Sequence, residues 1–242
     1  MWKRSKAPAF YPIPRKRYKW TVKPRPGPHP ASRSLPVAII LREILGVARN
    51  IREVKYILNQ GHFKIDGEVV RDYRYPVGLM DIVSLIPTKR CYRMLPTPKR
   101  VVYPTSIKEG EEVIKPCQVT GKRTVRGGLI QLSLHDGRTA LIKEEEMASI
   151  VKPGGTLVLN LEENEVSDYM PMEQGFVALM TGGKRRGLVG TIQDIRHPRK
   201  LGPKVVSVEL KDGSEIETIQ SYIFPIGREE PVISLQAMEE EQ

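Results

Sequence analysis

The fold of this chain is decided by the stretch Arg52-Glu53-Val54-Lys55-Tyr56-Ile57-Leu58, with Gly61 and Lys64-Ile65-Asp66-Gly67 after it. Asn50 stands three residues before Glu53, which is the spacing of a capping box and predicts a helix that starts at Asn50. Apolar side chains recur along one side of this helix, and Gly61 is placed to end it. Asp66-Gly67 is the strongest short signal of a hairpin turn, so we expect a strand on each side of it.

A preceding helix is predicted from Leu35 onward. Ser34 is placed to cap it, and Pro36 is tolerated in the first turn of a helix. Gly46 is placed to end or kink it. A later strand at 81–86 completes a small sheet. Two helices and a short sheet therefore form one small module.

The charges of the chain are divided unevenly along its 242 residues. Residues 1–100 contain 22 Lys and Arg but 6 Asp and Glu, and the remaining residues contain 17 and 22. The net charges of +16 and −5 indicate a polyanionic partner that is bound mainly by the N-terminal part, and they argue against a small metabolic enzyme. Two cysteines exclude a disulfide framework and a Cys-rich zinc site. No apolar run approaches the roughly 18–20 residues that cross a bilayer.

The first 34 residues form a basic, proline-rich arm with ten Lys and Arg, seven prolines and no acid. We expect the arm to be extended, because proline blocks helices and the arm cannot bury enough apolar area alone. Its five aromatic residues suit stacking on unpaired bases while the cations meet phosphates. The alternatives are a solvated tail, or an arm whose aromatic side chains pack back on the body.

Residues 101–170 are predicted to form short strands joined by turns. His135-Asp136-Gly137-Arg138 is interpreted as a hairpin loop rather than a catalytic His–Asp pair, because no nucleophile pattern accompanies it. Glu144-Glu145-Glu146 is interpreted as a solvated charge run, because no spaced His or Asp supports a metal site. We therefore expect a central β domain without catalysis.

Residues 176–192 are predicted to form a strand, a glycine-rich basic loop and a second strand, with Lys184-Arg185-Arg186 at the loop tip. This pattern resembles the KOW motif, a small β-barrel element of ribosomal proteins and transcription-elongation factors. A nucleotide-binding phosphate loop is excluded, because the Gly-Lys-[Ser/Thr] ending and the following helix are absent. The acidic tail, 229–242, is expected to be mobile or to lie against protein.

The helical module resembles the αL RNA-binding module of ribosomal proteins, tyrosyl-tRNA synthetases, pseudouridine synthases and heat-shock proteins. For Arg52 and Lys55 alone, a solvated helix face is the simpler interpretation. The whole basic cluster favours a phosphate-binding face. It consists of Arg49, Arg52, Lys55, His62, Lys64, Arg71 and Arg74.

Three separated signatures occur in a characteristic order along the chain. They are Lys19-Trp20 with 24–29, then Arg52-Glu53-Val54 with 64–67 and 75–81, and finally 134–138 with 180–190. Together they resemble the S4e family of small-subunit ribosomal proteins, in its archaeal type, over residues 3–235. Phe10 stands where the family leads us to expect tryptophan, and the acidic end also departs from its pattern.

The resemblance implies a cytoplasmic, structural protein of the 30S subunit that binds small-subunit rRNA and neighbouring 30S proteins. It implies no catalysis, cofactor, metal, membrane or small-molecule substrate. The compact modules would dock on folded RNA, and the arm would thread between RNA helices and order on binding.

The predicted fold class is α+β and multidomain. The parts are the extended arm 1–34, the αL module 35–100, the central β domain 101–170, the KOW- or SH3-like β-barrel 171–228 and the tail 229–242. The residues expected near RNA are Lys3, Arg4, Arg15, Lys16, Arg17, Lys19, Trp20, Arg25, His29, Arg49, Arg52, Lys55, Lys64, Arg74, Lys184, Arg185, Arg186, Arg196, His197, Arg199 and Lys200.

Two other functions could use the same modules. An RNA-modifying enzyme would need a catalytic domain with a nucleophilic Asp or a cofactor loop, and the two small β segments are too little for one. A transient translation or transcription factor could use the KOW-like barrel. Such a factor would wash off small subunits in salt, whereas a subunit protein would stay.

Overall fold

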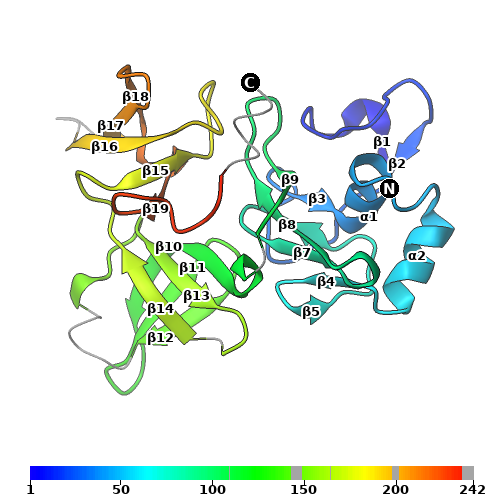
Figure 1. The fold of residues 1–242 in the computed structure, drawn as a ribbon, viewed down its shortest axis with the longest axis horizontal. Coiled ribbons are helices and arrows are strands. Elements are labelled where there is room, and N and C mark those ends of the chain that lie inside the picture. Colours follow the sequence, from blue (N-terminus) through cyan, green and yellow to red (C-terminus); the bar gives the residue numbers. More distant parts are fainter. Residues whose placement is uncertain (109, 143–148, 164, 198–201, 236–242) are drawn as a thin grey trace. The chain divides into compact units, whose positions relative to one another are not determined.

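The computed structural model describes residues 1–108, 110–142, 149–163, 165–197 and 202–235 (Figure 1). The chain divides into two compact units. Unit 1 contains Met1–Leu95 and Lys99–Val113, and unit 2 contains Pro96–Pro98 and Ile114–Gln242. Most elements are strands, with a few short helices in unit 1, so the α+β class is confirmed. Within the described ranges, no helix is long and apolar enough to cross a membrane.

Unit 1 combines short helical segments with small antiparallel sheets. Its strands are β1 (Trp2–Lys3), β2 (Trp20–Thr21), β3 (Leu35–Pro36), β4 (Phe63–Ile65), β5 (Glu68–Val69), β6 (Pro76–Val77), β7 (Ile82–Leu85), β8 (Arg90–Leu95) and β9 (Tyr103–Ser106). Its α-helices are α1 (Val37–Ile39) and α2 (Ile51–Asn59), with short helical turns at Arg4–Lys6, Ile86–Thr88 and Glu111–Val113. The largest sheet has the order β5-β4-β7-β8-β9. Because β9 pairs with β8, the domain boundary expected at residue 100 falls inside unit 1.

Helix α2 starts as its capping sequence predicts. The Asn50 side chain accepts hydrogen bonds from the backbone N–H groups of Arg52 and Glu53, at 2.9 and 3.0 Å. The Glu53 carboxylate reaches back to the N–H of Arg49 at 2.7 Å, one residue before the usual partner in a capping box. Gly61, with φ +74°, follows the helix. The prediction of this helix is confirmed.

The hairpin that follows α2 also matches its prediction. Asp66 and Gly67 both have positive φ, +50° and +83°, as a type I′ turn requires. The Asp66 carboxylate accepts a hydrogen bond from the N–H of Ile82 at 2.9 Å. The turn is therefore tied to β7 as well as closing β4 onto β5.

The start of the first helix differs from its prediction. Ser34 does not cap a helix, since its hydroxyl donates to the carbonyl oxygen of Pro30 at 2.9 Å. Leu35 and Pro36 are extended and pair with β6. Helix α1 therefore begins at Val37, and it continues as a π-helical segment, η2 (Ile40–Ile44), that ends before Gly46 at φ +64°. Strand pairing with a distant segment replaced the local cap.

The arm is folded onto unit 1 instead of being extended. Strands β1 and β2 pair with each other, with Trp2 opposite Thr21. The buried arm residues Ala7, Tyr11, Ile13 and Val22 belong to the same hydrophobic cluster as α1 and α2. The arm has no separate core, but its apolar residues bury surface on the body. Of the alternatives drawn from the sequence, packing back on the body is the one observed.

Unit 2 consists of two five-stranded antiparallel sheets. The first has the order β12-β11-β10-β13-β14, formed by Thr139–Ile142, Ile130–Leu134, Ile114–Thr124, Thr156–Asn160 and Glu165–Met170. The second has the order β18-β17-β16-β15-β19, formed by Glu215–Ile219, Val205–Leu210, Val189–Arg196, Val177–Met180 and Ile223–Gly227, with a short helical turn at Gln220–Tyr222 before β19.

The two sheets of unit 2 contact each other. The Gln118 amide on β10 donates to the carbonyl oxygen of Ile223 at 2.8 Å, and the His135 ring lies edge-on to Phe224. The segments expected as two domains, 101–170 and 171–228, therefore share one compact unit from residue 114 onward. The expected charge run Glu144–Glu146 and the end of the acidic tail, 236–242, lie outside the described residues.

Candidate nucleic-acid interface

Arg4 holds the arm in a closed loop. Its side chain is 4% exposed and donates to the carbonyl oxygens of Pro14 and Trp20, at 2.7 and 3.2 Å. Its Nη2 also lies 3.9 Å from the Glu43 carboxylate. The Arg4 guanidinium therefore binds groups of the protein itself. Arg4 was expected near RNA, but burial makes it a structural residue, and we leave it out of the proposed RNA-binding set.

Arg15 closes the same loop from its exposed side. Its guanidinium donates to three carbonyl oxygens at 2.7–3.0 Å, those of Arg4, Ala7 and Pro8. The other cations of the loop that were expected near RNA are exposed. They are Lys3, Lys16, Arg17 and Lys19, beside the exposed ring of Trp20. The structure thus brings these sequence-predicted residues together on a loop of fixed shape.

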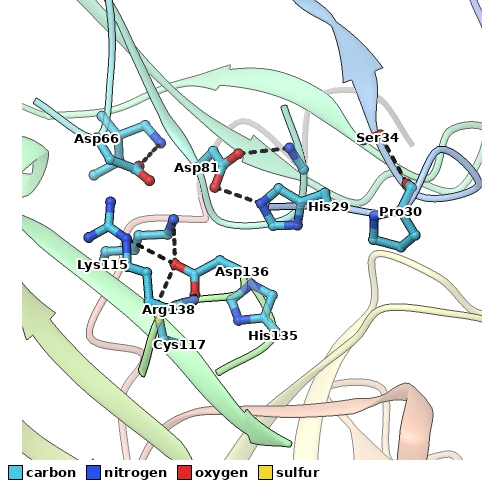
Figure 2. A network of polar contacts seen from close by, with 12 residues as sticks. His29, Pro30, Ser34, Asp66, Asp81, Lys115, Cys117, His135, Asp136 and Arg138 are labelled. Carbon is cyan, nitrogen blue, oxygen red and sulfur yellow. Dashed lines mark hydrogen bonds and ion pairs between the residues drawn. The ribbon is translucent and has the colours of Figure 1, made fainter. Parts of the chain in front are cut away.

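His29 connects the arm to the loop before β7 (Figure 2). Its side chain is 5% exposed, and its Nε2 lies 3.0 Å from Oδ1 of Asp81. The other carboxylate oxygen of Asp81 accepts from the N–H of Gly78 at 2.8 Å. A Cβ on Gly78 would lie only 2.2 Å from Cγ of His29. The expected RNA contact of His29 is therefore replaced by a buried latch, and we leave His29 out of the proposed set.

Replacing Gly78 with alanine should loosen the arm. The new methyl group must push the His29 ring away, and overpacking of this kind costs about 1–3 kcal/mol. Both tryptophans of the chain, Trp2 and Trp20, are in the arm, so their fluorescence reports its docking directly. We expect Gly78→Ala to change this emission and to lower the urea midpoint. Gly121→Ala, whose Cβ would meet its nearest atom at 3.8 Å, is the matched control. Identical emission and midpoints in the two variants would contradict the latch.

A second basic surface forms where the arm, α2 and the segment before β6 meet. The Lys55 ammonium and the Arg74 guanidinium lie 5.2 and 5.9 Å from the ring centre of Tyr73. Arg25, from the arm, lies 5.8 Å from the ring centre of Tyr75 and 3.0 Å from the Asp72 carboxylate. The predicted residues Arg25, Lys55 and Arg74 are thus joined through two tyrosines and one carboxylate.

The aromatic residues of this surface were not predicted from the sequence. Tyr73 and Tyr75 could have been found from the alternation Arg71-Asp72-Tyr73-Arg74-Tyr75, which places aromatic rings between cations. Tyr56 was also missed, although it lies four residues after Arg52 on α2 and its side chain is 63% exposed. Arg49 and Arg52 are exposed, and Lys64 is half-buried on β4.

In unit 2, the glycine-rich loop between β15 and β16 is held by Tyr222. The N–H of Thr181 donates to the carbonyl oxygen of Tyr222 at 2.8 Å, and a Cβ on Gly182 would lie 2.5 Å from the Tyr222 ring. Glycine therefore lets the loop pack flat against the tyrosine. Lys184 and Arg185 are exposed at the tip, and Arg186 is half-buried.

The second basic patch of unit 2, which was predicted at Arg196, His197, Arg199 and Lys200, contains a cation that is already paired with carboxylates of the protein. The Arg196 guanidinium lies 2.8 Å from the carboxylate of Asp194 and 3.3 Å from that of Glu217. The hydrogen bond from Arg196 lowers the pKa of Asp194 below its usual value. Arg196 is thus paired with two carboxylates although its side chain is 65% exposed, and His197 is also exposed. Arg199 and Lys200, also expected near RNA, lie outside the described residues.

Comparison with known proteins shows which family this chain belongs to. The family description "Ribosomal family S4e" matches residues 88–166, "RS4NT (NUC023) domain" matches residues 2–32, and "S4 domain" matches residues 37–83. The small ribosomal subunit protein eS4 of Staphylothermus marinus is 42% identical, over 95% of this chain and 92% of its own length. The chain belongs to the ribosomal S4e family. The eS4 protein of Methanothermobacter thermautotrophicus is 40% identical over 96% and 94% of the two chains.

A solved S4e structure has a similar fold. The crystal structure of the 30S ribosomal protein S4e from Thermoplasma acidophilum is similar with a TM-score of 0.68 and 27% identity. The match covers 81% of this chain and 95% of that one. The resemblance to S4e that was inferred from three separated signatures is confirmed. The S4 match also spans α1, α2, β4, β5 and the first half of β7, which belong to the segment expected to form the RNA-binding module.

Asp136 of this S4e chain lies in a buried polar network, not in a catalytic one (Figure 2). Its carboxylate lies 3.0 Å from the Lys115 ammonium and 3.4 Å from Nε of Arg138. Burial acts to raise the pKa of Asp136, but the charge of the Lys115 ammonium holds the pKa below its usual value. The residues 135–138 connect β11 to β12, so their interpretation as a hairpin loop is confirmed.

Cys117, His135 and Asp136 also place three potential metal ligands within 4.8 Å of one another. Their bonds argue against an ion. Nδ1 of His135 already accepts from the backbone N–H of Gln118 at 3.1 Å. A cation at the Asp136 carboxylate would have to displace the ammonium of Lys115, which is fully buried. The cluster therefore stabilises the hairpin through its own charges.

Proposed function

We propose that this S4e chain is a structural protein of the small ribosomal subunit that binds small-subunit rRNA by charge neutralisation and shape recognition. The observation that carries the proposal is the convergence of Arg25, Lys55 and Arg74 around Tyr73 and Tyr75. Cations held beside aromatic rings suit phosphates and unstacked bases together. Membership of the S4e family, whose named relatives are small-subunit proteins, supports the same function.

In the part of the chain that the structure describes, some exposed cations of the basic surfaces are not paired with carboxylates of the protein. Ion pairs found among the described residues involve none of the exposed cations Lys16, Arg52 and Lys184. An RNA backbone can neutralise these groups without breaking protein ion pairs. Because A-form grooves present little sequence to side chains, the fit of the two units to folded RNA provides the specificity.

The folded arm changes the mechanism expected from the sequence. A disordered arm would lose conformational freedom when it threads between RNA helices. This arm is already held by the Arg4 contacts and by the His29 latch. It therefore docks as a preformed loop, and its ordering is included in the folding of unit 1. Preorganisation of this kind raises affinity by reducing the entropy lost on binding.

The finer parts of the proposal concern unit 2. The loop between β15 and β16 is a KOW-like element of a small barrel, and it presents Lys184 and Arg185 to rRNA. Its support is the packing of Gly182 on Tyr222, which fixes the loop while leaving the tip exposed. The acidic tail 229–242 is not part of the RNA-binding surface, because its five glutamates and its lack of a base after Arg228 oppose phosphate.

Co-sedimentation separates this function from its alternatives. Small subunits purified in moderate salt should contain the chain in a number equal to that of other subunit proteins. A transient factor would wash off. Incubation with rRNA, followed by mass spectrometry of the nucleosides, should reveal no modification, whereas an RNA-modifying enzyme would leave one. Absence of the chain from salt-washed subunits would contradict the proposal.

Single substitutions should distinguish the two basic patches of unit 2. Arg185 is exposed at the loop tip, whereas Arg196 is already paired with Asp194 and Glu217. We expect Arg185→Gln to reduce the slope of log K against log salt for rRNA binding by about 0.7–0.9, the value of one phosphate contact. Arg196→Gln removes the same charge and should change the slope less. Filter binding across a salt series measures both. A larger effect at Arg196 than at Arg185 would contradict the proposal that the tip of the β15–β16 loop binds rRNA.

A further inference from the structure

The tip of the arm surrounds a small basic hollow of about 320 Å³. It is lined by Lys3, Arg4, Ser5, Arg15, Lys16, Arg17, Tyr18 and Lys19. Six of these eight residues are cationic, and none carries a carboxylate. The volume is at the lower end of the roughly 300–1,000 Å³ found for small-ligand sites. The hollow therefore suits an anion about the size of one nucleotide.

The wall of the hollow is built by the protein itself. Arg4 donates to the carbonyl oxygens of Pro14 and Trp20, and Arg15 donates to three more across the loop. These hydrogen bonds fix the backbone that carries the exposed cations. Within the described part of the chain, no ion pair involves Lys16, Arg17 or Lys19. Like charges held this close repel each other, and a bound anion relieves the repulsion.

Tyr18 provides the apolar part of the hollow. Its side chain is 58% exposed, and the guanidinium groups of Arg4 and Arg17 lie 4.9 and 5.4 Å from its ring centre. Arg4 is fixed by its buried contacts, but Arg17 is exposed. A planar base can therefore take the place of Arg17 over the ring, while Arg17 turns to the phosphate.

We propose that this hollow binds one nucleotide of an unpaired RNA segment, with its phosphate among Lys16, Arg17 and Lys19 and its base on Tyr18. The inference rests on the proposed function and deepens it by naming unpaired RNA as the ligand of the arm. A duplex offers such a hollow only its backbone, because its bases are stacked inside. An unpaired strand offers a phosphate and a free base together, so it is the preferred ligand.

The test uses the full chain and a short oligoadenylate strand, followed by tryptophan fluorescence, since Trp2 and Trp20 are both in the arm. Lys16→Gln/Arg17→Gln removes two cations of the hollow. Lys6→Gln/Arg33→Gln removes two exposed cations that do not line it and is the charge-matched control. We expect the first pair to reduce the salt slope by about 0.7, the value of the one phosphate that the hollow holds, and the control pair to change it much less.

Variants of Tyr18 test the base contact. Tyr18→Ala should weaken oligoadenylate binding about 5- to 150-fold, the range given by the loss of one stacked base. Tyr18→Phe should restore the affinity, because stacking does not need the hydroxyl. Unchanged emission of the unbound variants shows that the arm is still folded. Equal affinities of Tyr18→Ala and the wild type would overturn the base contact and with it the nucleotide site.

Two further probes separate the inference from the proposed function. An RNA duplex of the same length should bind the hollow more weakly than the strand, and inorganic phosphate should compete poorly. Stronger binding of the duplex, or equal competition by phosphate, would overturn the nucleotide site. So would equal losses in the two double variants. In each case the proposed function stands if the wild type still binds small-subunit rRNA fragments, and it fails if the wild type binds none of them.

Discussion

Raising the salt concentration from about 50 to about 200 mM is expected to weaken the binding of small-subunit rRNA to this chain by roughly 10³- to 10⁵-fold. The estimate follows from about 6–10 phosphate contacts, which the two units can supply from their exposed cations. The N-terminal 100 residues alone carry a net charge of +16. Each contact releases counterions from the RNA, and the released ions gain less entropy in concentrated salt. Filter binding or fluorescence anisotropy across a salt series measures the slope.

The control for this result is a variant that keeps the fold and loses charge. Lys184→Gln/Arg185→Gln alters the exposed tip of the β15–β16 loop and leaves the contacts of Thr181 and Gly182 with Tyr222 in place. Its slope should be shallower by about 1.4–1.8, which is two contacts. A nearly flat salt dependence of the wild type would contradict charge neutralisation as the source of affinity, even if the chain is found in small subunits.

Replacing Lys115 with methionine is expected to destabilise unit 2 by about 3–5 kcal/mol. The Lys115 ammonium and the Asp136 carboxylate are 3.0 Å apart, and the two side chains are 1% and 2% exposed. Removing the ammonium leaves a buried carboxylate without its main counter-charge, which costs more than the net value of the pair. Urea unfolding followed by circular dichroism measures the loss. Lys152→Met, which removes an exposed ammonium of the same unit, should have little effect.

The double variant Lys115→Met/Asp136→Leu should recover much of the lost stability. It removes the isolated charge together with its partner, and hydrophobic replacement of a buried ion pair is often neutral or stabilising. The recovery also tests the metal alternative, since a site formed by Cys117, His135 and Asp136 would be lost with Asp136. A double variant less stable than Lys115→Met alone would show that Asp136 has a stabilising role independent of Lys115.

The pH dependence of this pair has a definite sign. The pKa of Asp136 is lowered in the folded chain, so its contribution to stability is present above the ordinary Asp pKa of about 3.9. The contribution is lost as the pH falls through the lower, folded value. Without Lys115, burial acts to raise the pKa of Asp136 in the variant, so the stability difference between the wild type and Lys115→Met should shrink as the pH falls from neutral. A difference that grows on acidification would contradict the assignment.

The sequence by itself determined the elements whose signals are local. Asn50 and Glu53 are three residues apart and fix the start of α2, and Asp66-Gly67 supplies the left-handed residues of the hairpin. The strands around the β15–β16 loop and the S4e family followed from motifs read in order. The excess of positive charge in the first 100 residues is also independent of the fold.

Only the tertiary structure decided which cations face solvent. Arg4 has the same residue type as its exposed neighbours Arg15 and Arg17, yet it is buried against Glu43. His29 was expected near RNA together with them, yet it is buried against Asp81. Ser34 does not cap a helix, because Leu35 after it pairs with Val77 in a strand. The arm folds because its few apolar residues find surface on a body that the arm sequence does not contain. Caps and turns involve residues a few positions apart, whereas burial depends on contacts between distant segments, so it is settled only when the chain has folded.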